Sequence, residues 1–445
     1  MKIIGYFHLF PPEHNAGSET TVHAALRAMV DRGHEVTVIC DRSKTAPYQI
    51  DGIQVIRPPR RGVDTWLREI VKPADLVITH LDLTSQAMTL CVGYKPLVHF
   101  VHNDAQLKYW HVNTVKCQLA VFNSNWLSEA EEWPGPQIII HPVVEPKRYR
   151  CERGESITLV NPTSGKGAKT FYDLAQMMPE RQFLTAQGGY GIQVPCPKVN
   201  HPTGRLNHTF FDDQGREVPC LGLPNVTHIK NDPDIRNVFR RTKVLLMPSE
   251  AESYGRVGVE AACAGIPTIA HPTTGLREAF GDAAIFCDRN DVAAWFIEID
   301  RLLTDEVYYR KRSDMALELA ASLDPEPEFD RLEKALLVTS SDWKKRDEVM
   351  AVKMWMPDTR LWETSEGKLV REIDGRIPQN AVRQWGIGPI PEEVAIRNGL
   401  IPDPEQKTEA KAIEGPAENK AIEGPVENKG IDPRRRGRRP KVEAA

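Results

Sequence analysis

The sequence contains no apolar run long enough to cross a membrane, which takes about 20 mostly apolar residues. The first residues, MKIIGYFHLFPPEH, are apolar over too short a stretch for a secretory signal, and no small-residue cleavage site follows them. We therefore expect no transmembrane segment and a cytoplasmic location.

The sequence also lacks the paired spacing of a disulfide framework. Its eight cysteines are scattered and stand mostly in apolar stretches, which favours reduced thiols inside a core. A strong overall charge is missing as well, because the net formal charge is −4, and no general affinity for polyanions follows. With 445 residues, 41% of them apolar, the chain has the length and composition of two or three domains with ordinary cores.

Most of the chain alternates short apolar runs with one-faced helical patterns, which is typical of α/β domains built on parallel sheets. We predict a first domain of this kind over residues 1–148. It begins with a strand at 2–8, a loop that contains Gly17, and a helix that ends at Gly33. Further strands are predicted at 35–40, 53–57, 75–79, 97–101 and 120–123.

A second α/β domain is predicted over residues 149–340, after a linker rich in proline and charge near 142–154. Residues 192–221 interrupt its strand–helix rhythm and are interpreted as an inserted β-hairpin. The insertion holds two cysteines and two histidines, but their wide spacing argues against a zinc site. The strands of this domain are predicted at 157–161, 182–186, 226–230, 243–247 and 266–270.

The stretch from Pro248 to Glu278, PSEAESYGRVGVEAACAGIPTIAHPTTGLRE, carries the strongest functional pattern. It follows a buried strand and passes through a glycine-containing turn into a short helix, which places Glu252 before the helix and Glu260 about one turn inside it. Free backbone N–H groups at such a helix start favour a phosphate, and carboxylates accept hydrogen bonds from sugar hydroxyls. The alternative is that Glu252 only complements the helix dipole and that Glu260 is a solvated helix residue.

A second candidate for phosphate binding is Lys166, which stands between two glycines in a predicted strand-to-helix loop. The loop is not a P-loop, because it lacks the first glycine of that motif and the serine or threonine after the lysine. The alternative is an exposed lysine in a flexible loop. An Asp-x-Asp pair, Asp232 and Asp234, is interpreted as the start of a helix rather than as a metal site.

Polar residues also follow the predicted strand at 97–101. His102 and Asp104 come just past its carboxyl end, where ligands bind in open parallel sheets, and we expect them to contact hydroxyls of a bound sugar. His99, three residues earlier, competes with His102 for this role. The alternative is a histidine that only caps neighbouring backbone groups.

The pattern P-S-x-x-E-x-x-G-x-x-x-x-E-A-x-x-x-G-x-P, from Pro248 to Pro267, resembles the signature of the retaining nucleotide-sugar glycosyltransferases of family four. The runs Arg32 to Val36, RGHEV, and Lys166-Gly167 resemble two further motifs of that family. The resemblance covers residues 1–339 and implies a GT-B fold, in which two Rossmann-like domains face each other across a cleft. It also implies transfer of a sugar from a nucleoside-diphosphate sugar with retention, without a metal or other cofactor.

The resemblance implies roles for individual residues. Glu252 and His102 are the expected catalytic residues, and Asp104 is expected on the acceptor side. The expected donor-binding residues are Gly17, Lys166, Tyr254, Gly255, Arg256, Val257 and Glu260.

Two positions depart from the family pattern. An alanine replaces the first of two glycines, which leaves Gly17 as the candidate for contact with the donor. Asn161 replaces an arginine that usually lies five residues before the lysine. Neutralisation of the diphosphate is then expected to fall to Lys166, with help from Lys169 or Thr163.

Other functions stay open at the level of the sequence. A sugar-nucleotide epimerase of the same fold would consume the donor without any acceptor. A nucleic-acid-binding protein with an inactive transferase core would bind no donor. The acceptor is not encoded in these motifs, and lipids, glycans, proteins and DNA are all candidates.

The composition changes after Ser340. Residues 341–403 carry four tryptophans and are predicted to form a small ordered appendage. Residues 404–445 contain a polar, proline-bearing direct repeat and are predicted to be a disordered tether. The tether ends in a basic run that loosely resembles an AT-hook. Contact with nucleic acid or another anionic surface is one candidate role, and the alternative is that the run only keeps the tail soluble. Its basic residues are Arg434, Arg435, Arg436, Arg438, Arg439 and Lys441.

Overall fold

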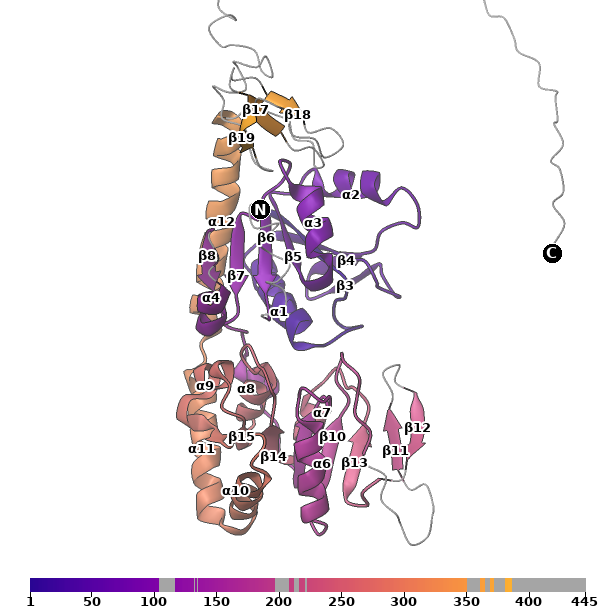
Figure 1. The fold of residues 1–445 in the computed structure, drawn as a ribbon, viewed down its shortest axis with the longest axis vertical. Helices are drawn as coiled ribbons and strands as arrows, with labels where there is room; N and C mark the ends of the chain where they lie inside the picture. Colours follow the sequence, from indigo (N-terminus) through magenta and orange to yellow (C-terminus); the bar gives the residue numbers. More distant parts are fainter. Residues whose placement is uncertain are drawn as a thin grey trace, which may run out of the picture. The chain divides into compact units, whose positions relative to one another are not determined.

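The computed structural model describes residues 1–103, 117–131, 133, 135–196, 208–211, 216–220 and 222–349, together with three short strands between residues 361 and 385. Two α/β domains follow one another along the chain, each built on a mostly parallel sheet (Figure 1). The predicted fold class is confirmed.

The first domain is built on an eight-stranded sheet. Its strands are β1 (Lys2–Phe7), β2 (Glu35–Cys40), β3 (Tyr48–Ile50), β4 (Ile53–Ile56), β5 (Leu76–His80), β6 (Leu97–Val101), β7 (Leu119–Phe122) and β8 (Gln137–Ile139). Its helices include α1 (Gly17–Asp31), α2 (Val63–Val71), α3 (Thr84–Cys91) and α4 (Asn125–Glu131). The spatial order is β3-β4-β2-β1-β5-β6-β7-β8, and all neighbours are parallel except β3 and β4. The chain therefore reverses its direction of travel across the sheet between β1 and β5, which marks a ligand crevice in open parallel sheets.

The second domain is built on a six-stranded, fully parallel sheet. Its strands are β9 (Ser156–Val160), β10 (Phe183–Ala186), β13 (Val226–Ile229), β14 (Thr242–Met247), β15 (Thr268–Ala270) and β16 (Ile285–Phe286). Its helices include α6 (Ala168–Met177), α7 (Arg236–Phe239), α8 (Arg256–Ala262), α9 (Thr274–Phe280), α10 (Val292–Thr304) and α11 (Glu306–Ser322). The spatial order is β13-β10-β9-β14-β15-β16, so the reversal falls between β9 and β14.

The central strands are buried from end to end, as continuous apolar runs predict for parallel sheets covered on both faces. Every residue of β6 and of β7 is buried, and β14 is buried except at Lys243. The two sheets belong to separate apolar clusters, and the cluster of the second domain includes the fully buried Phe171 and Trp295. Each domain thus has a core of its own.

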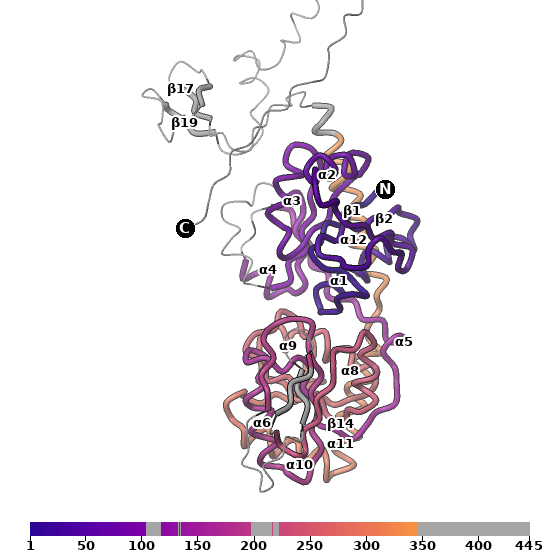
Figure 2. Tube along the Cα trace, turned by 90° about the vertical axis from the view of Figure 1, so that its right-hand side faces the viewer, coloured from indigo at the N-terminus to yellow at the C-terminus, as the bar shows by residue number. Residues whose placement is uncertain are grey.

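The last long helix, α12 (Pro325–Val349), lies against the first domain (Figures 1 and 2). Its buried residues Phe329, Leu332 and Leu336 belong to the same apolar cluster as β1 and α1. Arg32, from the RGHEV run, donates hydrogen bonds to two carboxylates of this helix. Residues 325–340 are predicted to belong to the second domain, whereas the apolar side chains of this helix pack in the core of the first.

Three smaller features complete the fold. Strands β11 (His208–Phe211) and β12 (Glu217–Cys220) form an antiparallel hairpin within the predicted insertion. An antiparallel sheet of β17 (Leu361–Thr364), β18 (Leu369–Arg371) and β19 (Ala381–Trp385) falls in the region of the tryptophan-containing appendage. The predicted tether and its basic run at 434–441 lie outside the described residues.

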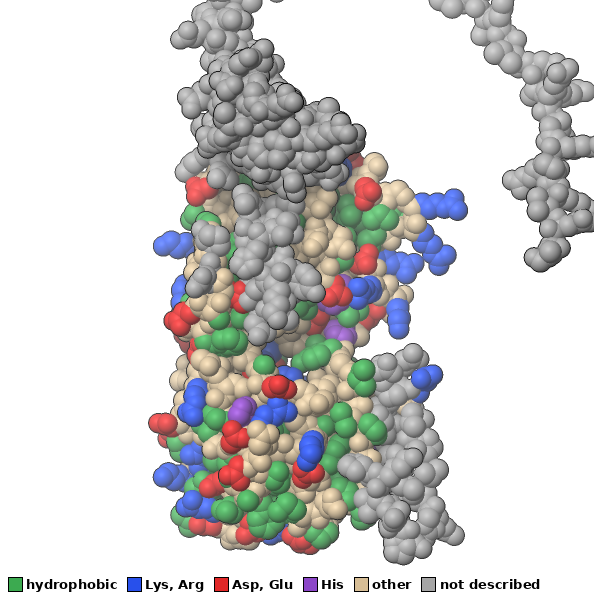
Figure 3. Space-filling model, in the orientation of Figure 1, with side chains coloured by type: hydrophobic (Ala, Val, Ile, Leu, Met, Phe, Trp, Pro, Cys, Tyr) green, Lys and Arg blue, Asp and Glu red, His purple; other side chains and the backbone are tan. Residues whose placement is uncertain are grey.

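Charges of both signs are mixed over the face of the two domains shown in Figure 3. This mixture agrees with the net formal charge of −4. A charged ligand is therefore expected to be selected by local side chains rather than by the field of the whole protein. In the part of the chain that the structure describes, no helix has the length and apolar character needed to cross a bilayer.

Candidate functional site

Two adjoining pockets lie where the strand order of each sheet reverses. The loops after β1, β9 and β14 contribute to their walls. The larger pocket, of about 690 Å³, takes its lining from both domains, whereas the smaller pocket, of about 220 Å³, lies mainly in the second. The residues that line both are Ala16, Gly17, Lys166, Gly189, Tyr190, Glu252, Gly255 and Arg256. The pockets therefore meet at a junction that carries charged side chains.

Lys166 lies at this junction. The loop that carries it ends at Gly167, which has a φ of 82° and where a Cβ would lie 2.5 Å from the carbonyl oxygen of Pro248. The backbone N–H of Glu250 donates to the carbonyl of Gly165 at 2.8 Å, so that this loop is docked on the loop after β14. The Lys166 side chain is 21% exposed. The lysine is thus held at the pockets rather than free in a flexible loop.

Glu252 is the partner of Lys166. The Lys166 Nζ atom lies 2.5 Å from Oε1 of Glu252, which also accepts a hydrogen bond from Ser249 Oγ at 2.8 Å. Burial disfavours the charge of Lys166, but the Glu252 carboxylate and Tyr190 outweigh this effect and raise the pKa of Lys166 above its ordinary value. Lys166 is therefore a cation at neutral pH and is paired with the Glu252 carboxylate.

Arg256 is a second cation at the junction and the first residue of α8. Its guanidinium donates hydrogen bonds to Glu260 Oε1 at 2.6 Å, to the Tyr149 hydroxyl at 2.9 Å and to Thr21 Oγ1 at 3.2 Å. Because Thr21 belongs to α1, Arg256 also links the two domains. The Glu260 side chain is 10% exposed and lines the smaller pocket, so it is not a solvated helix residue. Since α8 has only seven residues, most of the positive charge here comes from side chains.

Of the two residues expected to help Lys166 in place of the missing arginine, Thr163 lines the larger pocket and Lys169 lines neither pocket. Asn161 has a φ of 62°, and its Oδ1 accepts a hydrogen bond from Gln193 Nε2 at 2.8 Å, so it shapes the wall of the smaller pocket. The Lys169 side chain is 87% exposed, pairs with Asp173 at 2.6 Å and lines neither pocket. The expectation that Lys169 assists Lys166 is therefore wrong, and Arg256 is the second cation near the junction.

The remaining donor-side predictions fall on the same pockets. Gly255 precedes α8 with a φ of 92°, a conformation that favours glycine. Gly17 begins α1 and faces open space, because nothing lies within 4 Å of a Cβ built there. Tyr254 lines the larger pocket and Val257 the smaller. Burial raises the pKa of Tyr254 to about 12, which keeps its hydroxyl protonated.

His102 lines the larger pocket from the first domain. Its Nε2 lies 3.1 Å from Nδ1 of His80, and burial lowers the pKa of His102 to about 3. The ring is therefore neutral at physiological pH and acts through hydrogen bonds rather than charge. His99 is fully buried, lies 3.1 Å from the Thr84 hydroxyl and lines neither pocket, so His102 is the better placed of the two. Asp104 lies outside the described residues.

Asp232, the first residue of the Asp-x-Asp pair, lines the smaller pocket, and both aspartates form turns. Asp232 Oδ1 accepts a hydrogen bond from the backbone N–H of Asp234 at 2.8 Å, and Asp234 accepts one from that of Arg236 at 3.0 Å. The helix itself begins at Arg236, later than predicted. Both carboxylates accept local backbone hydrogen bonds, but the predicted start of the helix at this pair is wrong.

A polar contact between the domains involves Glu278, which the sequence analysis did not assign to this role. Its carboxylate accepts hydrogen bonds from the backbone N–H groups of Asn125 at 2.7 Å and Trp126 at 3.1 Å. It also lies 2.9 Å from Nε2 of His141, whose Nδ1 lies 3.4 Å from Glu328 in α12. His141 thus bridges two carboxylates that belong to different helices.

We expect His141 to make stability depend on pH. The hydrogen bond with Glu328, opposed by burial and assisted by Glu278, raises the pKa of His141 above its ordinary value of about 6.5. A raised pKa in the folded state adds stability that is complete below about pH 6.5 and is lost as the pH rises through the raised pKa. His141→Gln should have a lower melting temperature than wild type, as measured by calorimetry. The difference should be largest in mildly acidic buffer and smallest in alkaline buffer. A difference that is constant with pH would contradict this role.

Three buried residues of the first domain were not predicted as site residues. His8 follows β1 and His80 ends β5, at the two strands between which the sheet reverses, and Glu19 lies in the first turn of α1. His8 and Glu19 also line the larger pocket. A histidine stands at the carboxyl end of each of these two strands. Because ligands bind in open parallel sheets where the strand order reverses, the two histidines could have been predicted to form a site once the strand order was known.

Two segments of the chain match known families. Residues 16–130 match the family described as Glycosyltransferase Family 4, and residues 220–318 match the family described as Glycosyl transferases group 1. The first segment contains Gly17 and His102, and the second contains Glu252, Arg256 and Glu260. The matched segments therefore contribute to the two sides of the larger pocket.

A D-inositol 3-phosphate glycosyltransferase of Corynebacterium kroppenstedtii is 32% identical to this chain over 105 residues. The alignment covers 23% of this chain and 23% of that protein. The chain therefore matches less than a quarter of the length of this curated relative.

Solved structures share the architecture of the two domains. Sucrose-phosphate synthase from Thermosynechococcus elongatus has a TM-score of 0.58 at 15% identity, covering 77% of this chain and 100% of that one. Alr3699/HepE of Anabaena, solved in complex with UDP-glucose, has a TM-score of 0.57 at 16% identity, covering 76% and 100%. At these identities the likeness shows the fold alone, and the expected GT-B fold is confirmed.

Proposed function

We propose that this chain, whose two domains carry the Glycosyltransferase Family 4 and Glycosyl transferases group 1 segments, transfers a sugar from a nucleoside-diphosphate sugar to an acceptor. The observation that carries the proposal is the pair of pockets that meet at Lys166, Glu252 and Arg256. A nucleotide sugar consists of a nucleoside, a diphosphate and a sugar in series, and the site offers a separate environment for each.

The smaller pocket suits the nucleoside. It contains Glu260, a buried carboxylate that accepts hydrogen bonds from ribose hydroxyls, and apolar side chains such as Ile235 and Leu245 for the base. The diphosphate then falls at the junction beside Lys166 and Arg256. Among the residues that the structure describes, these two are the only lysine or arginine side chains that line both pockets.

The larger pocket suits the donor sugar and an acceptor beside it. Glu252 and His102 reach it from opposite domains and offer hydrogen-bonding groups to sugar hydroxyls. Its volume of about 690 Å³ leaves room beyond one sugar ring, which favours transfer to an acceptor over epimerisation of the donor.

The proposed chemistry rests on charge at the leaving group. Breaking the bond between the anomeric carbon and the diphosphate develops negative charge on the departing oxygen, and fixed cations there stabilise the transition state. Lys166 and Arg256 supply that charge, so we propose that the diphosphate needs no metal ion. We propose retention of configuration because the signature from Pro248 to Pro267 resembles that of retaining glycosyltransferases.

A panel of nucleotide sugars tests the function of the full-length chain. HepE was solved with UDP-glucose, and the Corynebacterium relative is named for inositol 3-phosphate, so uridine donors and a phosphorylated polyol are tried first. We expect one preferred donor to bind and to be slowly hydrolysed, with release of the nucleoside diphosphate and of a sugar of unchanged anomeric configuration. An epimerase would instead leave the nucleotide attached to an altered sugar. A protein with an inactive core would bind none of the panel.

Glu260→Gln is expected to raise the KM for the donor by roughly tenfold with little change in kcat, because a hydrogen bond to a charged acceptor becomes a neutral one. The substitution also weakens the pair with Arg256, which lies 2.6 Å away. Steady-state kinetics with varied donor measures both constants. Glu155→Gln is the matched control, because the Glu155 side chain is 83% exposed in the same domain. An unchanged donor KM in Glu260→Gln would remove this residue from the site.

A further inference from the structure

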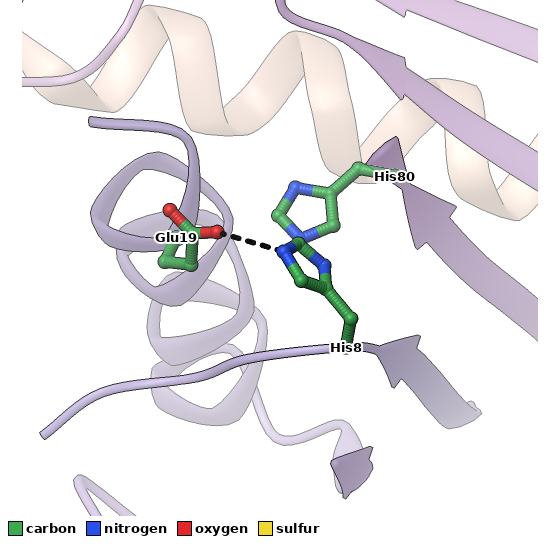
Figure 4. A group of neighbouring side chains, drawn as sticks. All are labelled: His8, Glu19 and His80. Carbon is green, nitrogen blue, oxygen red and sulfur yellow. Dashed lines mark ion pairs between the residues drawn. The ribbon is translucent and has the colours of Figure 1, made fainter. Parts of the chain in front are cut away.

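Figure 4 shows three buried side chains of the first domain that converge from different elements. His8 comes from the end of β1, His80 from the end of β5 and Glu19 from the first turn of α1. One ligand atom from each residue can be chosen so that all three lie within 4.8 Å of one another. The proposed transfer reaction assigns no role to this group.

Among the described side chains, the only ion-pair partner of Glu19 is His8, which carries a charge only when it is protonated. Glu19 is 1% exposed, and none of the lysines and arginines that the structure describes forms an ion pair with it. Ser18 donates a hydrogen bond to its Oε2 at 2.7 Å, which leaves the other oxygen facing His8. A buried carboxylate is costly without a cation or a full set of hydrogen bonds.

Each of the two histidines has a ring nitrogen without a hydrogen-bond partner. In the described part of the chain, Nδ1 of His8 and Nε2 of His80 are buried and have no hydrogen-bond partner. Buried ring nitrogens without partners are uncommon, because each loses its hydrogen bonds to water on folding. His80 therefore offers a free Nε2, whereas His8 faces Glu19 with its Nε2 rather than with the unpartnered Nδ1.

The separation of the groups fits ligands of one ion better than a hydrogen bond. Nε2 of His8 lies 3.7 Å from Oε1 of Glu19, which is too long for a hydrogen bond. Two ligands of one tetrahedral zinc ion, each bound at about 2.0–2.2 Å, lie about 3.4 Å apart. For this pair the difference is about 0.3 Å, and the ligand atoms of all three residues lie within 4.8 Å of one another.

We propose that His8, Glu19 and His80 bind a divalent first-row transition metal ion, with Zn²⁺ as the expected occupant. Two imidazoles and a carboxylate form a ligand set that leaves further coordination positions open. Because His8 and Glu19 line the larger pocket, an open position faces the space in which a substrate hydroxyl or a water molecule binds. The expectation of a reaction without a metal concerns the diphosphate junction, whereas this site lies on the first domain.

A neighbouring histidine orients His80 for this role. Nδ1 of His80 lies 3.1 Å from Nε2 of His102. When the proton is on Nδ1, His80 donates this hydrogen bond and keeps Nε2 free as a ligand. Metal-binding histidines commonly donate their second ring N–H to a nearby acceptor, which fixes the ring and its tautomer. The inference does not depend on glycosyl transfer, because it concerns binding of the ion itself.

The test measures zinc bound to the full-length protein after removal of metal with a chelator and dialysis against Zn²⁺. We expect wild type to bind one equivalent more than Glu19→Gln, whose affinity at this site falls at least tenfold. Co²⁺ bound at the site should show an absorption spectrum without thiolate charge-transfer bands, which separates it from ions bound to the eight cysteines. Zn²⁺ should also raise the melting temperature of wild type but not of the variant.

His23→Gln is the matched control. His23 lies on the same helix, and its Nε2 is 3.2 Å from a carboxylate oxygen of Asp51, but it has no third ligand in the group. This variant should bind zinc like wild type. If Glu19→Gln does not fold, His8→Gln takes its place. Equal zinc binding by wild type and the folded variant overturns the proposal, and so does equal loss in His23→Gln. Weaker binding of the donor by Glu19→Gln without any difference in zinc would make the group a substrate contact instead.

Discussion

Lys166→Ala is expected to lower kcat by roughly 10²–10³-fold, the cost of removing one preorganised group that stabilises developing negative charge. Lys166 lies at the junction of the two pockets and is held by a loop docked on Pro248 and Glu250. A departing diphosphate at this junction gains charge beside its Nζ atom. Arg256 remains in the variant, so activity is reduced rather than abolished. Single-turnover kinetics with saturating donor isolates the chemical step.

Lys169→Ala is the matched control for this prediction. Lys169 is three residues further along the same segment, but its side chain is 87% exposed and lines neither pocket. It should retain turnover close to wild type. A fall in kcat of the same size in both variants would mean that the loop responds to any loss of a lysine, and Lys166 would lose its specific role.

Glu252→Ala is expected to reduce turnover by about 10²-fold while leaving the affinity for the free nucleoside diphosphate nearly unchanged. Glu252 accepts hydrogen bonds from Ser249 and Lys166 and lines the larger pocket, where the donor sugar is proposed to lie. Its removal takes a hydrogen-bond acceptor from that sugar, and it also leaves Lys166 without its partner. The first effect lowers turnover, and the second leaves the cation available to the diphosphate.

Two measurements separate these effects, steady-state kinetics with the donor and calorimetric titration with the nucleoside diphosphate. Glu155→Ala, in the same domain, is the control, because its side chain is 83% exposed and lines neither pocket. Loss of nucleoside diphosphate affinity in Glu252→Ala together with unchanged turnover would assign Glu252 to the nucleotide rather than to the sugar.

The parallel strands were predictable because each is a short buried apolar run bounded by polar residues or glycine. The predictions at 35–40 and 97–101 coincide with β2 and β6, and most others differ by a residue or two. The short edge strands β3 and β8 and the helices α2 and α3 were not predicted. Edge strands depend on their neighbours for hydrogen bonds, and short helices depend on packing that a local pattern does not contain.

Chain order alone does not predict which domain α12 packs against. Its sequence predicts a helix after residue 325, but the partner of that helix is set by contacts with residues almost 300 positions away, such as Arg32 and His34. These two residues belong to the RGHEV run that carries part of the family resemblance. The run therefore contributes to holding the last helix on the first domain and does not line either pocket.

Site residues that stand in local motifs were predictable, whereas contacts between segments far apart in the sequence were not. Lys166, Glu252 and Glu260 stand in motifs whose glycines and strand ends mark a ligand loop, and the structure brings all three to adjoining pockets. The pair of Lys166 with Glu252 joins loops 86 residues apart, for which no local pattern exists. Arg256 was predicted as a donor contact, but its hydrogen bond across the domains to Thr21 emerges only from the fold.

A crystal structure of the full-length chain with the nucleotide sugar selected by the panel tests the central claim most directly. We predict the base in the smaller pocket, the ribose hydroxyls on Glu260 and the diphosphate within hydrogen-bond distance of Lys166 Nζ. The sugar should extend into the larger pocket toward Glu252 and His102. A nucleotide bound elsewhere, or bound here with its diphosphate turned away from Lys166, would contradict the account.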